Sequence, residues 1–314
     1  MTSAQNLNET SQRLVAPEFR PAAAYLLKGS PRLPPNLSLV RVDDSDVGPI
    51  LTHRDDIVVG HSIRTTKSWE PSEGRFLRSV LRPGMNAIDV GANIGYFTLL
   101  MSGLVGANGH VLAVEAEPDT FQLLRANIEL NDLRNVSAVP VAAHRAAGLV
   151  TITRNPHNHG GSSAVHTWAD WSTAPVQAVR LDDVLNPDLP IDVVKIDIEG
   201  MDHAAVEGLE RTLARWRPLF LVEFNPIWIE VLGEVPTEIL RYYRDLGYQI
   251  RLLGGDALRL QREAGMAIDE LLLDNLEVSH RNEGELIERT KRIHFINLIL
   301  TKLESQGAWR RSRD

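Results

Sequence analysis

Cysteine is absent from the 314 residues of the chain. Its absence excludes disulfides, cysteine nucleophiles and thiolate metal sites. Long apolar runs are absent too, since no stretch reaches the ~18 uninterrupted apolar residues of a membrane span. Residues 1–19 lack the apolar core of a signal peptide. We therefore expect a protein that is neither exported nor embedded in a membrane, and a cytoplasmic location, with which the missing cysteines are compatible.

Basic residues are fewer than acidic residues and form no long run. The chain has 33 Lys and Arg and 41 Asp and Glu, which gives a net charge of −8. Because affinity for nucleic acid comes largely from neutralising phosphates, this balance argues against a nucleic-acid partner. A hydrophobic content of 43% indicates a folded chain. We expect one large domain with an extension. We also expect the protein to act on a small-molecule acceptor, and the sequence leaves open whether it forms a homo-oligomer.

The first 66 residues are predicted to form an irregular arm and a small hairpin. Three prolines fall within Lys28–Asn36, which favours irregular structure. Two β-branched runs, "LSLVRV" (37–42) and "DIVVGHSIRT" (56–65), are expected to pair as the hairpin. Residues 67–304 are assigned to the main domain, which opens with a helix over 71–81, and residues 305–314 to a tail.

Strands and helices alternate from residue 84 onward. Strands are predicted at 85–90, 110–117, 136–143, 191–198, 219–224, 248–253 and 295–303, and helices at 95–105, 119–131, 202–216 and 236–247. Strands that are aliphatic on both faces and separated by amphipathic helices predict a parallel sheet covered on both sides, the doubly wound α/β class. Residues 153–177 lack a clear period and are a candidate lid; residues 254–290 are ambiguous.

The turn "IDVGANIGYFTLL" (88–100) follows the first strand of this series. In an open parallel sheet the ligand lies beyond the carboxyl ends of the strands. Gly91 and Gly95 let the backbone approach a ligand, and the amides that open the next helix supply donors. The spacing is G-x-N-x-G rather than the dinucleotide G-x-G-x-x-G. Asp89 favours a cation, and the ammonium of S-adenosyl-L-methionine supplies one, while the helix amides suit its carboxylate.

Glu115 ends the second strand, twenty residues beyond Gly95. A carboxylate at this place can accept hydrogen bonds from both hydroxyls of a ribose. We therefore interpret the glycine turn and Glu115 as parts of one nucleoside site. An ordinary strand-to-helix connection is the alternative for the glycine turn taken alone.

A second polar group ends the strand on the other side of the point where strand order reverses. In "VVKIDIEG" (193–200), period-two geometry places Lys195, Asp197 and Glu199 on one face. A lysine beside two acids can hold a carboxylate ionised and aimed at an acceptor hydroxyl. The alternative is a structural ion pair with helix capping by Asp202.

Two further kinds of residue are candidates near the same crevice. Glu223 and Asn225 end the next strand, although a turn before Pro226 would explain them equally well. A neutral imidazole suits proton removal, but most loop histidines are only solvated; those near strand ends or the lid are His144, His157, His159, His166 and His203. Oxygens of the strand-end acids would suit magnesium, but the spacing does not require it and no metal site is predicted.

The ordered motifs of the chain resemble the FkbM-type family of S-adenosylmethionine-dependent methyltransferases. The resemblance rests on "WEP" (69–71), "IDVGANIGYFT" (88–98), "VEAEP" (114–118), "LLRANIELN" (123–131), "GGSS" (160–163), "LDDV" (181–184) and "KIDIEG" (195–200). It implies a Rossmann-like class I methyltransferase domain, with a mostly parallel seven-stranded sheet and an antiparallel last strand. It also implies O-methylation of hydroxyls on sugars or specialised metabolites.

The resemblance places the cofactor against Asp89, Gly91, Asn93, Gly95 and Glu115, and the acceptor near "GGSS" and "KIDIEG". Together with the polar residues described above, it leads to three predicted sets of residues. The cofactor is expected against Trp69, Asp89, Gly91, Asn93, Gly95, Tyr96, Glu115 and Ala116, the last replacing a proline that the family usually has. The acceptor is expected near Gly161, Ser162, Ser163, Glu223 and Asn225. Catalysis is expected from Asp197 or Glu199 as the base, supported by Lys195, with His159 or His203 as weaker candidates for the base.

Two other functions compete with methyl transfer. A nicotinamide-dependent oxidoreductase would use the same fold and the acid of the second strand, but it lacks its glycine spacing here. A non-catalytic nucleoside-binding module would keep the fold without chemistry, and the polar residues that end the fourth and fifth strands argue against it.

Overall fold

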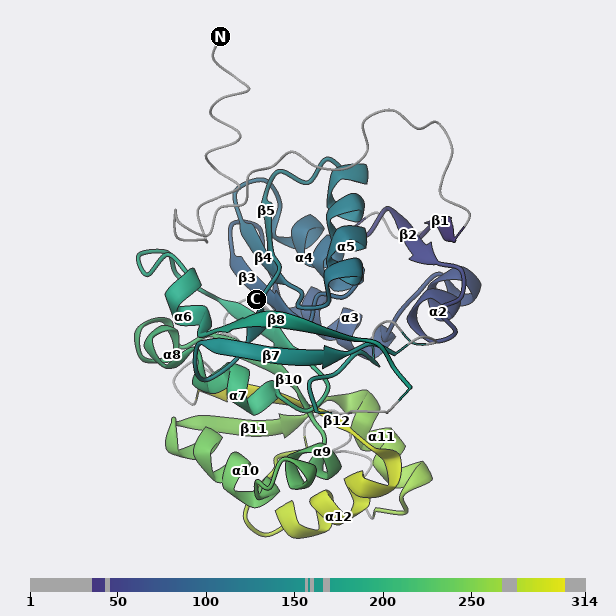
Figure 1. The fold of residues 1–314 in the computed structure, drawn as a ribbon. Helices are drawn as coiled ribbons and strands as arrows, with labels where there is room; N and C mark the ends of the chain where they lie inside the picture. Colours follow the sequence, from purple (N-terminus) through teal and green to yellow (C-terminus); the bar gives the residue numbers. More distant parts are fainter. Residues whose placement is uncertain are drawn as a thin grey trace.

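The computed structural model describes residues 36–42, 46–155, 158, 161–165, 170–266 and 276–302 (Figure 1). Its central element is a seven-stranded sheet. The strands follow one another across the sheet as β11 (Tyr248–Leu252), β12 (Ile296–Lys302), β10 (Leu219–Phe224), β9 (Val193–Ile196), β3 (Asn86–Val90), β4 (His110–Val114) and β5 (Val136–Val139). β12 runs antiparallel to both of its neighbours, whereas β10, β9, β3, β4 and β5 pair in parallel. The predicted sheet with its antiparallel last strand is confirmed.

Helices cover both faces of this sheet, because successive strand residues point to opposite sides. Ala87 joins a cluster with residues of α2 (Val59–Thr66), α3 (Pro71–Val80), α4 (Tyr96–Val105) and α5 (Pro118–Leu130). Its neighbours Ile88 and Val90 join the other cluster, with residues of α6 (Leu181–Val184), α7 (Asp202–Glu207), α8 (Glu210–Trp216), α9 (Pro226–Val231), α10 (Pro236–Asp245), α11 (Gly254–Glu263) and α12 (Glu283–Ile293). Figure 1 shows α4 and α5 toward one end of the view and α10 and α12 toward the other. The doubly wound α/β class is confirmed.

The hairpin forms, but the prediction of its second strand is wrong. β1 (Leu37–Arg41) pairs with β2 (Pro49–His53), which falls in the segment expected to be a turn. The run expected to pair, residues 56–65, is largely α2. Its buried residues Val59 and Ile63 lie four apart, which is helical spacing. Asp56 accepts hydrogen bonds from the amides of Val58 and Gly60 at 2.9 and 3.0 Å and so stabilises the start of the helix.

The hairpin packs against α5 through a buried asparagine. The Asn127 side chain accepts a hydrogen bond from the Leu51 amide at 2.6 Å and donates to the carbonyls of Leu51 and Ile94 at 3.0 and 2.7 Å. Ile50 and Leu51 belong to the same apolar cluster as Leu124 of α5. The extension and the glycine turn are therefore tied to one helix.

A second, three-stranded sheet lies beside the first. Its order is β6 (Ala142–Ala143), β8 (Thr173–Val179), β7 (Gly148–Thr153). The strand predicted over 136–143 is thus two strands, one in each sheet, and the candidate lid includes the beginning of β8. The helix predicted over 202–216 is divided into α7 and α8 near Gly208, where a Cβ atom would lie 2.4 Å from the His144 carbonyl oxygen.

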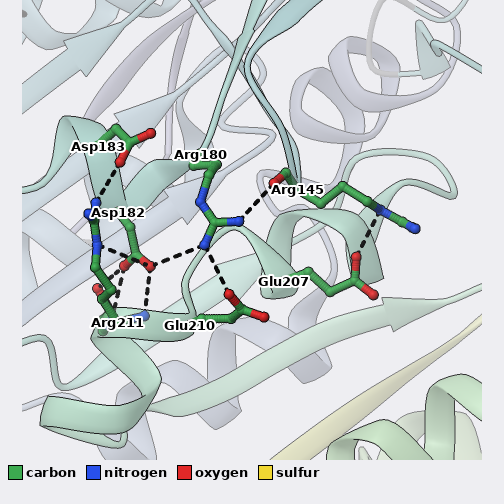
Figure 2. A network of polar contacts seen from close by, with 8 residues as sticks. Arg145, Arg180, Asp182, Asp183, Glu207, Glu210 and Arg211 are labelled. Carbon is green, nitrogen blue, oxygen red and sulfur yellow. Dashed lines mark hydrogen bonds and ion pairs between the residues drawn. The ribbon is translucent and has the colours of Figure 1, made fainter.

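The "LDDV" motif has a structural role in anchoring α8 (Figure 2). The Asp182 carboxylate is 1% exposed. It accepts hydrogen bonds from the amides of Arg211 and Thr212 at 2.7 and 3.0 Å and from the Thr212 hydroxyl at 2.8 Å. Figure 2 shows the side chains of Arg180 and Arg211 reaching it from two sides. Both carboxylate oxygens are therefore used to hold the first turn of α8.

Replacing Asp182 with asparagine is expected to lower the free energy of unfolding by about 2–4 kcal/mol, because an amide NH₂ would face buried donors and a charged acceptor would be lost. Urea denaturation measures the change. Asp183→Asn is the matched control, since the Asp183 side chain is 48% exposed and pairs with the same Arg211. The control should cost under ~1 kcal/mol. Equal losses in both variants would contradict an anchoring role for Asp182.

Candidate functional site

A cavity of about 250 Å³ lies at the carboxyl ends of β3, β4, β9 and β10. This is where the strand order of the sheet reverses, between β3 and β9. The predicted residues that line it are Trp69, Gly91, Asn93, Tyr96, Glu115, Ala116, His144, Ser162, Lys195, Asp197, Glu199 and Glu223. The structure therefore brings residues of all three predicted sets into one cavity.

Other predicted residues lie outside this lining. Gly161 and Ser163 are behind it, and the Ser163 hydroxyl donates a hydrogen bond to the Glu199 carbonyl at 3.1 Å. Asn225 caps α9, accepting from the Trp228 amide at 3.3 Å. His203 is buried beside Glu234, with 2.6 Å between Nε2 and Oε2. Neither Asn225 nor His203 lines the cavity, so the geometry of the site does not support their predicted roles; His159 lies outside the described residues.

The glycine turn brings two strand ends together. Gly91 has φ +77°, and a Cβ atom there would lie 1.8 Å from the carbonyl oxygen of Asp197. Only glycine allows the end of β3 to approach the residue after β9 this closely. Gly95 has φ +95° and caps α4, and a Cβ there would meet Leu124 at 2.7 Å, so it serves packing rather than lining the cavity.

Glu115 is held in place by the backbone. Its two carboxylate oxygens accept hydrogen bonds from the amides of Asn93 and Glu117, both at 2.8 Å. Asn93 has φ +51°, in the left-handed region. Burial raises the pKa of Glu115 to about 7 despite these two amides. The carboxylate is thus fixed in orientation at the cavity wall, as recognition of a ribose requires.

Asp89 lies behind the cavity wall. It is fully buried, and the Thr98 hydroxyl donates a hydrogen bond to its Oδ2 at 2.6 Å. It faces Lys195 in the register of β3 and β9. Burial raises the pKa of Asp89, while the charge of Lys195 and the Thr98 bond oppose the rise. The predicted direct contact of Asp89 with a ligand is therefore not supported; its position is that of a partner for Lys195.

Lys195 and Asp197 form an ion pair at the end of β9, with 2.9 Å between Nζ and Oδ2. The Lys195 side chain is 3% exposed and that of Asp197 is 25% exposed. Burial opposes the charge on Lys195, but Asp197, Asp89 and Glu70 together raise its pKa. Burial likewise opposes ionisation of Asp197, yet Lys195 and a hydrogen bond with Glu223 lower its pKa. Lys195 therefore keeps its proton and holds Asp197 ionised.

Three other carboxyl groups surround Asp197. Burial, reinforced by the charge of Asp197, raises the pKa of Glu223 well above its usual value and that of Glu199 to about 8. The same causes raise the pKa of Glu70. Glu70 was missed by sequence reasoning, although it lies within the "WEP" motif. It precedes the proline that begins α3 and adopts φ +40°, a conformation that the sequence does not announce.

No group of three or more histidine, aspartate or glutamate side chains is arranged to hold a metal ion within the described ranges. The magnesium alternative for Asp197, Glu199 and Glu223 therefore has no geometric support. Among the helices of those ranges, none has the length and apolar character needed to cross a membrane.

The topology and the cavity over its switch point define a Rossmann-like α/β domain of the class I methyltransferase type. A family model described as "Methyltransferase FkbM domain" matches residues 89–250, slightly more than half of the chain. The chain belongs to this methyltransferase family.

Individual relatives match shorter stretches. The protein-L-isoaspartate O-methyltransferase of Methanothrix thermoacetophila is 42% identical over 59 residues, 19% of this chain and 28% of that protein. The protein-L-isoaspartate O-methyltransferase 2 of Arabidopsis thaliana is 40% identical over 55 residues, 18% of each chain. The crystal structure of the methyltransferase FkbM from Methylobacillus flagellatus KT is 17% identical, with 57% of this chain and 46% of that chain covered and a TM-score of 0.38. The curated relatives are thus matched over less than a third of their own length.

S-adenosylmethionine is the cofactor of this methyltransferase family, and the residues present fit it. Glu115 would accept the ribose hydroxyls, and the N-terminus of α4, which begins at Tyr96, opens onto the cavity. Trp69, Tyr96 and Ala116 supply apolar wall. When bound, the cofactor provides a methyl group on a positively charged sulfur, and the carboxylates of this cavity suit that charge.

Binding of 5′-methylthioadenosine, which keeps the ribose but has no titrating amino group, is expected to strengthen about tenfold from pH 6 to pH 8. The reason is that only ionised Glu115 accepts both hydroxyls, and its pKa is about 7. Calorimetry at the two pH values measures the change. Glu115→Gln, the control, should bind weakly at both. An unchanged affinity in the native protein would show that Glu115 does not contact the ribose.

Proposed function

We propose that this protein is an S-adenosylmethionine-dependent O-methyltransferase that acts on a hydroxyl of a sugar or of a specialised small-molecule metabolite. The observation that carries the proposal is the ion pair of Asp197 with Lys195 at the end of β9, in the same cavity as Glu115. A carboxylate that keeps its charge beside a methyl donor can accept the proton of a hydroxyl.

The reaction is a direct displacement. The acceptor oxygen attacks the methyl carbon, a C–O bond forms, and the C–S bond breaks with its electron pair going to sulfur, which leaves as S-adenosylhomocysteine. The hydroxyl proton passes to a carboxylate. The protein mainly aligns the oxygen and the methyl carbon at about 3 Å, and a positioned base adds ~10²–10⁴-fold.

Asp197 and Glu199 are the two candidate bases, and their pKa values separate them. Lys195 lowers the pKa of Asp197 against the effect of burial, so Asp197 is ionised at neutral pH. The pKa of Glu199 is about 8, so Glu199 is largely protonated there. If Asp197 is the base, kcat should be nearly constant between pH 6.5 and pH 8, because Asp197 stays ionised over that range; a rise through pH 8 would assign the role to Glu199.

Transfer of a labelled methyl group from S-adenosylmethionine to a panel of sugars and hydroxylated metabolites tests the proposal. An isoaspartyl peptide serves as the comparison, because the names of two relatives refer to that substrate. Calorimetry with NAD tests the oxidoreductase alternative. Failure to bind S-adenosylmethionine, or transfer to the peptide alone, would contradict the proposed function.

A further inference from the structure

One end of the cavity holds more carboxyl groups than its single cation can pair with. Four carboxyl groups and one ammonium line it: Glu70, Asp197, Glu199, Glu223 and Lys195. We call the three glutamates with Asp197 the acidic end. They come from separate elements, since Glu70 precedes α3, Glu223 lies in β10, and Asp197 and Glu199 follow β9. Three folded segments therefore converge on one volume.

The acidic end is distinct from the part of the cavity that holds Glu115. The charges of Glu70, Glu199 and Glu223 each interact with Asp197. Glu115 follows β4, whereas Asp197, Glu199 and Glu223 belong to the ends of β9 and β10 on the other side of β3, so the ribose acid and the acidic end lie over different strands.

The Glu223 side chain gives a separate indication that the acidic end binds a ligand. It is 7% exposed yet lines the cavity. Among the described residues, no amide or side chain donates a hydrogen bond to its Oε1. A buried acceptor without a donor costs about 1–3 kcal/mol. A ligand that brings an N–H donor to this oxygen would remove that cost.

The chemistry of the occupant follows from the spacing of the acids. They form no group suited to a metal ion in the part of the chain that the structure describes. An organic cation with several N–H donors can instead reach carboxyl groups that are spread over a wider volume. Of the organic cations, a primary ammonium offers three donors in a small volume.

We propose that the methyl acceptor carries a protonated amine, which Glu223 binds together with Glu70 and Glu199 while a hydroxyl of the same molecule faces Asp197. This inference rests on the proposed O-methyltransferase function and narrows its substrate class to amino sugars and other amino alcohols. The ammonium anchors the acceptor, and the hydroxyl remains the nucleophile.

The test compares glucosamine, galactosamine and 2-deoxystreptamine with their N-acetylated forms, which keep the hydroxyls and lose the charge. Calorimetry uses protein saturated with S-adenosylhomocysteine. At least one amine should bind about tenfold or more tightly than its acetylated form. E223Q and E70Q should each reduce that preference to under about threefold while their affinity for S-adenosylhomocysteine stays within about threefold of the native value. E230Q, an exposed acid of α9, is the control and should keep the preference.

The following binding results would each contradict the proposal of an amine acceptor. Equal binding of the amine and acetylated forms, tighter binding of the acetylated forms, or no binding of any amine would show that the acidic end does not select a cation. An equal loss of S-adenosylhomocysteine affinity in E223Q and E70Q would assign the acidic end to the cofactor. If the same samples transferred methyl groups to neutral sugars, the proposed O-methyltransferase function would still be supported although the proposal of an amine acceptor had failed. Failure of the one proposal can therefore be distinguished from failure of the other. Circular dichroism checks folding, and E70Q carries the test if E223Q does not fold.

Discussion

Gly91→Ala is expected to lower the free energy of unfolding by at least about 4 kcal/mol, or to prevent folding. The added Cβ would lie 1.8 Å from the backbone oxygen of Asp197 and 2.9 Å from its carbonyl carbon. Backbone atoms cannot rotate aside as a side chain can, so β3 and β9 would have to separate. A second cost is the φ of +77° at this position, which is unfavourable for any residue with a Cβ.

The contribution of the contact can be separated from that of φ. Gly84 has φ +89°, and a Cβ there would meet no atom within 4 Å. Gly84→Ala should therefore cost only the conformational term, about 1–2 kcal/mol. Urea denaturation of both variants gives the difference, which measures the close approach of the two strand ends. Equal losses would mean that these ends are not held together as the structure has them.

Much of the fold could be predicted because its strands are buried on both faces. β3, β4 and β9 are mostly aliphatic and buried along their whole length, and helices of opposite clusters separate them. The end of each run fixes where Glu115 and Asp197 lie, and the parallel arrangement brings those ends to one edge of the sheet. The cavity could therefore be located from the sequence alone.

Features that depend on contacts between distant segments could not be predicted. Residues 56–65 were expected to be a strand because they are β-branched, yet the packing of Val59 and Ile63 against the apolar cluster selects a helix. Glu70 was missed because its route into the cavity depends on a left-handed backbone before Pro71. A single residue with a left-handed backbone leaves no periodic pattern in the sequence from which it could be predicted.

The surroundings of Asp89 are a feature of the site that could not be predicted from the sequence. The alternation of a strand correctly places Asp89 on the same side as Ala87, and the register of β3 with β9 places it beside Lys195. Whether an acid at a strand end faces a ligand or a neighbouring lysine depends on contacts that the sequence of the strand does not show. In this protein Asp89 faces Lys195 and accepts a hydrogen bond from the Thr98 hydroxyl of α4, and it does not line the cavity.

Replacing Asp197 with asparagine is expected to reduce kcat by ~10²–10⁴-fold while the affinity for S-adenosylhomocysteine changes by less than about threefold. Asparagine has nearly the same shape but cannot accept the hydroxyl proton. The change also leaves Lys195 with Asp89 as its nearest remaining counter-charge, because Asp89 is its neighbour in the register of the two strands. The fold is therefore expected to persist, with a lower free energy of unfolding.

Glu199→Gln is the matched comparison for this variant, since Glu199 lines the same cavity and is protonated at neutral pH. At pH 7 it should reduce kcat far less than Asp197→Asn does. The reverse order of effects would make Glu199 the base. If Asp197→Asn instead weakened S-adenosylhomocysteine binding as much as turnover, Asp197 would be a cofactor-binding residue. In that case the ion pair with Lys195 would hold the donor in place, and the proton of the acceptor would have to leave by another group.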